Sequence, residues 1–177
     1  DSKENNERFF AGIPNIPKKV KDKMEIYLLF LQHITFSLKD NGKAAVVVPT
    51  GFITAQTGIA YKIRQKLVDE KMISGVVSMP SNIFATTGTN VSILFIDKSN
   101  TDDVILIDAS GLGEQVKDGK NKKTLLNSDE EKKIINVYNS KDSEEDFSVT
   151  VSYDDIKNNE YSLNPGQYFD VKIAYTH

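Results

Sequence analysis

The chain has 177 residues, 39% of them hydrophobic and 27% charged, which is an ordinary composition for a globular protein. It contains no cysteine, which excludes disulfides and cysteine-ligated metal sites. Because it has only two histidines, a metal site built from histidines is not expected. No stretch is long and apolar enough to span a bilayer, and no signal peptide opens the sequence. We therefore expect a cytoplasmic protein that meets no membrane.

The formal net charge of −3 points to no class of partner, but its distribution is uneven. Residues 1–98 carry 13 basic and 9 acidic residues, a net of +4, whereas residues 99–177 carry a net of −7. Such asymmetry permits a nucleic-acid face on the first part. Two solvent-exposed surfaces that differ in net charge explain the asymmetry more simply, because a net charge of +4 over a domain is mild.

The first helix is predicted at residues 23–39. Its apolar side chains recur at the spacing of one buried face, and Phe30 and Phe36 widen that face, so we expect a mostly buried helix. Gly42 is expected to take the left-handed conformation that often follows a last helical turn. A strand follows at 43–48, and its valine run without polar alternation predicts cover on both faces.

A second helix is predicted at 58–71 and a second strand at 73–79. The outer face of that helix carries three basic side chains: Lys62, Arg64 and Lys66. Because the two strands are joined by a helical crossover, we expect them to be parallel neighbours. The link to a third strand at 90–97 is too short for a crossover helix, so the third strand is predicted to run antiparallel to the second.

The character of the sequence changes after Ser99. A short strand is predicted at 103–108, followed by a polar, Gly/Lys-rich loop, "GLGEQVKDGKNKKT". A capping box beginning at Ser128 predicts a helix to about Asn139. The alternating "FSVTVS" that follows an acidic loop is typical of a half-exposed strand.

Two parallel strands and one reversed strand make an incomplete α/β sheet, because such sheets usually have five or more strands. The sequence contains no G-x-G-x-x-G and no P-loop. We therefore interpret the chain as the later half of a larger domain, with any cofactor loop upstream of residue 1.

Several separated blocks now point to one family. "RFFAGIP", "MEIYLLFLQHITFSLKDNGKAAVVVPTGFI" and "IRQKLVDEKMISGVVSMPSNIFATTGTNVSILFIDK" resemble the modification subunit of type I restriction–modification systems, as do "VILIDAS" and "VSYDDIKNNEYSLNPGQYF". That family comprises DNA adenine-N6 methyltransferases that use S-adenosylmethionine. The resemblance implies a Rossmann-like α/β methyltransferase sheet with one antiparallel strand. Residues 1–98 would be the C-terminal half of the methyltransferase domain, and residues 99–177 a small α+β C-terminal extension.

The resemblance also implies what this stretch lacks. The family's cofactor glycine loop and its catalytic Asn/Asp-Pro-Pro-Phe/Tyr loop would both lie before Asp1, so we expect no catalytic residue here and no activity of this stretch alone. "LNPGQYF" looks like a degraded catalytic loop. Glycine replaces the second proline there, which adds backbone freedom where rigidity is needed, so no catalytic role is assigned to Asn164.

Substrate-binding candidates lie in the loop "SNIFATTGTN". Phe84 resembles the aromatic residue that stacks on the flipped base, and Thr87 and Gly88 share its loop. The alternative for Phe84 is a side chain that plugs the core beneath the loop. Thr86 and Thr87 could bind phosphate or backbone, but such residues are more often ordinary turn hydroxyls.

Cofactor-binding candidates come from the first helix and the end of the first strand. Phe30 resembles the helix residue that packs near the cofactor adenine, although periodicity alone favours core packing. Glu25 could lie near the cofactor, or it could favour the helix N-terminus electrostatically. Pro49 stands at the carboxyl end of a strand, where open α/β sheets place ligands.

The resemblance implies double-stranded DNA and the specificity and restriction subunits of a type I complex as partners, with sequence read by the specificity subunit. Two other hypotheses remain open: a non-catalytic scaffold of the same fold that binds a protein, and a related methyltransferase with a small-molecule or protein substrate.

Overall fold

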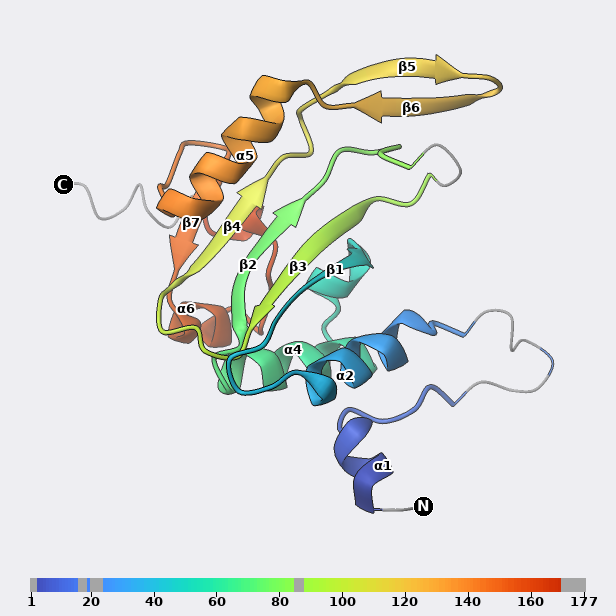
Figure 1. Ribbon diagram of the computed structural model, residues 1–177, viewed down its shortest axis with the longest axis vertical. Coiled ribbons are helices and arrows are strands. Elements are labelled where there is room, and N and C mark those ends of the chain that lie inside the picture. Colours follow the sequence, from blue (N-terminus) through green and yellow to red (C-terminus); the bar gives the residue numbers. More distant parts are fainter. Residues whose placement is uncertain (1–2, 16–18, 20–23, 85–87, 170–177) are drawn as a thin grey trace.

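The computed structural model describes residues 3–15, 19, 24–84 and 88–169 (Figure 1). Its helices are α1 (Lys3–Arg8), α2 (Tyr27–Ser37), α3 (Gly51–Thr54), α4 (Gly58–Asp69), α5 (Ser128–Ser140), α6 (Tyr153–Asn158) and the 3-10 turn η2 (Pro165–Gln167). Its strands are β1 (Lys43–Pro49), β2 (Ile73–Ser78), β3 (Val91–Asp97), β4 (Val104–Asp108), β5 (Glu114–Asp118), β6 (Asn121–Leu125) and β7 (Ser148–Val151). None of the helices in these residues is both long and apolar enough to cross a bilayer.

Five strands form one mixed sheet in the order β1-β3-β2-β4-β7. β3 runs antiparallel to β2, which confirms the predicted reversed strand. The prediction that β1 and β2 are neighbours was wrong, because β3 lies between them and pairs antiparallel with both. The helical crossover makes β1 and β2 run in the same direction, as predicted. It does not make them adjacent, because the next strand, β3, inserts between them. β4 then continues the sheet parallel to β2, and β7 runs antiparallel to β4.

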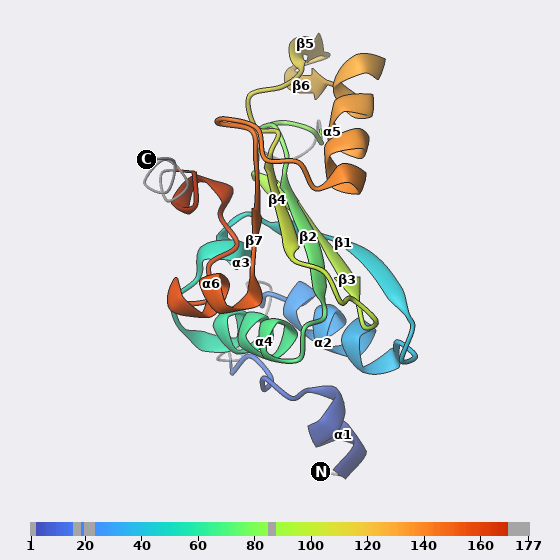
Figure 2. The same ribbon diagram turned by 90° about the vertical axis from the view of Figure 1, so that its left-hand side faces the viewer.

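The two faces of the sheet are covered unequally (Figure 2). α2, α4 and α6 pack on one face, whereas α5 packs on the other over β2 and β4. β2 is therefore buried along its whole length. β1 alternates between exposed and partly buried residues, and Val47 is 48% exposed. The expected cover on both faces of β1 is thus wrong for the described residues, because α5 does not extend over that strand.

α2 is less buried than predicted. Its buried stripe is narrow and includes Leu28 and Leu31, while Phe30 is 61% exposed and Phe36 is 37% exposed. Each phenylalanine falls outside that stripe on the helical wheel, so the apolar count overstated the buried face. The prediction for Gly42 was also wrong, since it has no positive φ; its N–H donates to the Lys39 carbonyl in a turn where a Cβ would lie 2.9 Å from that oxygen.

The polar stretch predicted as a loop forms the β5–β6 hairpin, a separate two-stranded sheet. Residues 119–120 connect its strands, with Gly119 at φ +62° in the first central position, where a two-residue hairpin turn requires a positive φ. The hairpin was missed because its strands lack the apolar alternation that normally indicates a strand.

α5 begins one residue earlier than the sequence indicated. Its N-cap is Asn127, whose side chain accepts from the backbone N–H groups of Asp129 and Glu130, and the Glu130 carboxylate accepts from the Asn127 N–H. The capping box is therefore real, but its first member is Asn127 rather than Ser128.

This cap gives a first prediction. Asn127→Ala removes the acceptor for two N–H groups, so we expect it to lower the free energy of unfolding by about 1 kcal/mol. Ser128→Ala, the matched control one residue along, should change it by less than about 0.5 kcal/mol. Urea unfolding of both variants measures this, and a larger loss for Ser128→Ala than for Asn127→Ala would contradict the assignment.

Candidate functional site

A cavity of about 310 Å³ opens at the carboxyl end of β1. Pro49 ends the strand there, and the chain turns directly into the short helix α3. The cavity is lined by Pro49 and α3 on one side and by Glu25 and Tyr27, at the start of α2, on the other. The structure thus brings together two of the three residues that the sequence assigned to a cofactor.

The end of β1 is fixed to the start of β3. The Thr50 N–H donates to the Asn90 carbonyl at 2.8 Å, and the Thr50 and Ser92 hydroxyls lie 3.1 Å apart. The loop that leads into β3 therefore arrives beside the cavity. Since that loop carries Phe84, the substrate-binding and cofactor-binding candidates lie at the same end of the sheet.

Arg64 supports the cavity from beneath. It was predicted on the exposed face of its helix, but its side chain is fully buried. Its guanidinium donates to the carbonyls of Phe52 at 2.5 Å and Ala55 at 2.5 Å, which both line the cavity, and to that of Tyr161 at 2.7 Å. Burial lowers the pKa of Arg64 to about 10, so the group stays charged at neutral pH and its hydrogen bonds are charge-assisted.

A signal for Arg64 was present in the sequence. Ala60, Ile63 and Leu67 follow the spacing of one helical face, and position 64 lies among them. Its charge led to the opposite prediction, because arginine is rarely buried unless it is paired. The partners that permit its burial are backbone carbonyls, which no sequence pattern displays.

Tyr27 brings a hydroxyl to the same cavity. Its ring meets Phe52 edge-on, with centroids 6.3 Å apart. Burial, together with the nearby Glu25 carboxylate, raises the pKa of Tyr27 to about 12. The phenol therefore keeps its proton and can donate a hydrogen bond, while Glu25 can accept one. A ligand with both an apolar ring and hydroxyl or amino groups suits this lining.

Phe84 does not fill the core beneath its loop. It is 46% exposed, and it does not line the Pro49 cavity. Gly88 is also exposed, with no heavy atom within 4 Å of where a Cβ would stand. Thr87, with Thr86, lies outside the described residues. The structure therefore leaves Phe84 as an aromatic side chain open to solvent at the carboxyl end of β2.

Phe30 stands apart from the other cofactor candidates. Its exposed ring lines a different hollow, of about 290 Å³, with Phe9, Ile26 and His33 among its neighbours. Phe30 therefore does not pack in the core, which the helical periodicity favoured. It also does not line the Pro49 cavity with the other cofactor candidates.

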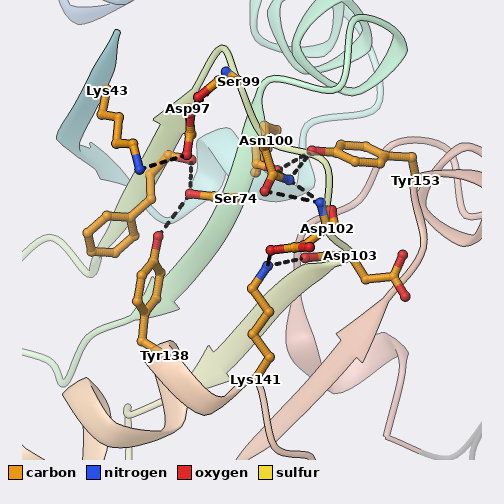
Figure 3. Close-up of polar contacts among 12 residues, drawn as sticks. Lys43, Ser74, Asp97, Ser99, Asn100, Asp102, Asp103, Tyr138, Lys141 and Tyr153 are labelled. Carbon is orange, nitrogen blue, oxygen red and sulfur yellow. Dashed lines mark hydrogen bonds and ion pairs between the residues drawn. The ribbon is translucent and has the colours of Figure 1, made fainter. Parts of the chain in front are cut away.

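A larger cavity, of about 440 Å³, lies at the opposite end of the sheet, and its polar groups pair with one another (Figure 3). The Ser74 and Tyr138 hydroxyls lie 2.8 Å apart, and the Asn100 amide donates to the Tyr153 hydroxyl at 2.6 Å. Two ion pairs complete the cluster: Lys43 with Asp97 at 3.2 Å and Lys141 with Asp102 at 3.4 Å. These contacts tie α5, α6 and the residues beside them to the sheet, which is a structural role.

Asn164 also has a structural role. Its side chain accepts from the Gly166 N–H at 3.2 Å and caps the turn η2. That "LNPGQYF" is no catalytic loop stays a prediction from the sequence.

Comparisons with known proteins show which family the sequence matches. The model of the N-6 DNA methylase family matches residues 1–175. The chain is 34% identical over 143 residues to a type I restriction enzyme methylase subunit (MpnII) from Mycoplasma pneumoniae, covering 80% of this chain and 25% of that protein. It is 29% identical over 157 residues to another such subunit (MjaIX) from Methanocaldococcus jannaschii, covering 82% and 27%.

A solved structure is similar as well. The methyltransferase subunit of a type I restriction–modification system from Streptococcus thermophilus superposes with a TM-score of 0.77 at 30% identity, covering 94% of this chain and 34% of that one. The chain thus spans about a quarter to a third of the length of the proteins it matches.

Proposed function

This chain belongs to the N-6 DNA methylase family, and we propose that it forms part of a protein that transfers a methyl group from S-adenosylmethionine to the N6 atom of adenine in double-stranded DNA. The whole protein would be the modification subunit of a cytoplasmic type I complex with specificity and restriction subunits. The observation that carries the proposal is the cavity at the carboxyl end of β1, held beside the loop of Phe84 by the reversed strand β3.

The chemistry explains why an exposed aromatic residue belongs at this end of the sheet. Adenine N6 is a weak nucleophile whose lone pair is delocalised and which a base pair hides, so the base must leave the duplex to react. Phe84 would stack on the flipped base, which contributes about 1–3 kcal/mol per base in comparable sites. Stacking orients the amino group toward the donor methyl and replaces the contacts that the base loses.

The residues of the cavity fit an adenosyl cofactor. Glu25 would accept hydrogen bonds from hydroxyl groups of the cofactor, and Pro49 would contact its apolar surface. When bound, S-adenosylmethionine supplies an activated methyl group on a positively charged sulfur, so the reaction needs no metal. A role for Phe30 stays a prediction from resemblance, because its ring lies in another hollow.

The edge of the sheet supports a larger domain. Among the described strands β1 pairs only with β3, and Val47 on its uncovered face is 48% exposed. An apolar strand with a free edge normally pairs or is covered. We propose that the glycine loop and the Asn/Asp-Pro-Pro-Phe/Tyr loop belong to the remainder of the whole protein, and that residues 99–177 extend the domain formed with residues 1–98.

The test is methyl transfer by the whole protein with its partner subunits. Incubation with S-adenosylmethionine carrying a labelled methyl group and with duplex DNA should place the label on adenine N6, and this chain alone should give no incorporation. Label on a protein or a small molecule instead of DNA would contradict the proposal. Absence of any transfer, with partner subunits still bound, would favour the non-catalytic scaffold.

A further inference from the structure

The β5–β6 hairpin is anchored to the loop that carries Phe84. Thr124, on β6, is buried; its N–H donates to the Asn82 carbonyl at 2.8 Å and its hydroxyl donates to the Ser81 carbonyl at 2.6 Å. Both views show the hairpin beyond the carboxyl ends of β2 and β4, beside that loop (Figures 1 and 2). The hairpin thus has a fixed position next to the proposed base-binding residue.

The hairpin concentrates positive charge. Residues 114–125 contain four lysines and two acidic residues, a net of +2 in a chain whose second half is acidic. The four lysines are Lys117, Lys120, Lys122 and Lys123. In the described part of the chain the ion pairs engage other lysines: Lys43, Lys66, Lys132, Lys133, Lys141 and Lys157. The hairpin lysines are thus available to an external anion.

Two of these lysines directly face each other. Lys117 and Lys122 are register partners across the hairpin. Like charges directly opposite in an antiparallel pair are destabilising, so this arrangement is unfavourable in the free protein. A polyanion bound over the pair would remove that repulsion. The repulsion between these two lysines therefore favours binding of a phosphate-rich partner.

The lysine pair lies on the same face of the hairpin as the anchoring residue Thr124. Cross-strand partners share a face and successive residues alternate, so Lys117 and Lys122 are on the same face as Thr124 and Gln115. Lys122 is two residues from the anchoring Thr124, which corresponds to about 7 Å along the strand. The charged pair is therefore close to Ser81 and Asn82, in the loop that carries Phe84.

We propose that the β5–β6 hairpin binds the sugar–phosphate backbone of DNA beside the flipped base, through Lys117 and Lys122. This inference rests on the proposed function. Lysine contacts to phosphate fix the position of a protein on the duplex without reading sequence. The hairpin would thus hold the strand next to Phe84, while sequence recognition stays elsewhere.

The test compares two double variants of the whole methylase complex. Lys117→Gln/Lys122→Gln removes the hairpin pair. Lys39→Gln/Lys71→Gln is the control, because it changes the charge by the same amount at two exposed lysines near the opposite end of the sheet. The dissociation constant of a fluorescent DNA duplex is measured by anisotropy between about 50 and 200 mM salt, with thermal unfolding to confirm that both variants are folded.

Each lost phosphate contact lowers the salt slope by about 0.9. We therefore expect the hairpin variant to show a slope smaller by about 1.8 and weaker binding for target and non-target duplexes alike, while the control matches the unaltered complex. Equal slopes and affinities for the two variants would overturn the hairpin proposal alone. Failure of the unaltered complex to bind or methylate DNA would instead refute the proposed function.

Discussion

Replacing Arg64 with methionine is expected to lower the free energy of unfolding by about 3–5 kcal/mol. The methionine side chain fills a similar volume but donates no hydrogen bond. The carbonyls of Phe52, Ala55 and Tyr161 would then lose their guanidinium partner. Each buried acceptor left without a donor costs about 1–3 kcal/mol, and relief from burying the charge offsets part of that loss.

The measurement is urea unfolding, with Lys62→Met as the matched control two residues away on the exposed side of the same helix. The control should change the free energy of unfolding by no more than about 0.5 kcal/mol. A loss below about 1 kcal/mol for Arg64→Met would mean that the three carbonyls find other partners, and that Arg64 does not hold α3 beneath the cavity.

Phe84→Ala is expected to reduce methyl transfer to DNA by about 5- to 150-fold in the whole protein. This range corresponds to the loss of about 1–3 kcal/mol of base stacking. Affinity for S-adenosylmethionine should be unchanged, since Phe84 does not line the cavity that contains Glu25 and Pro49. Single-turnover transfer and equilibrium cofactor binding measure the two effects separately.

Two further variants make the result specific. Phe84→Tyr keeps an aromatic face and should restore most of the transfer rate. Ile135→Ala truncates another exposed apolar side chain, on α5, and should leave the rate unchanged. An unaffected rate in Phe84→Ala, or an equal loss in Ile135→Ala, would exclude Phe84 as the stacking residue.

The sequence predicted the part of the fold that depends on local connections. The link predicted between the second and third strands, residues 80–89, is too short for a crossover helix, and this alone indicated that β3 is reversed. The partner of β1 could not be predicted in the same way, because pairing between β1 and β3 joins strands that are not consecutive. The β5–β6 hairpin was missed since its turn chemistry, rather than any apolar alternation, determines it.

The site was predictable to a similar extent. Glu25 and Pro49, both assigned to the cofactor from the sequence, line one cavity, and Phe84 is exposed in the loop beside it; their roles stay predictions. Phe30 faces elsewhere because helical spacing places it outside the narrow buried stripe of α2. The roles of Arg64 and Thr124 escaped prediction, since both depend on backbone carbonyls brought close only by the tertiary fold.

One experiment distinguishes the two ends of the sheet as the place where DNA reacts. A duplex with photoreactive 5-iodouracil in place of the target adenine is crosslinked to the whole methylase complex, and the attached peptide is identified by mass spectrometry. If the base is received at the carboxyl ends of β1 and β2, a crosslink within this chain falls on the peptide that contains Phe84. Attachment instead to the polar cluster around Ser74, Asn100 and Tyr138, at the opposite end, would contradict that placement.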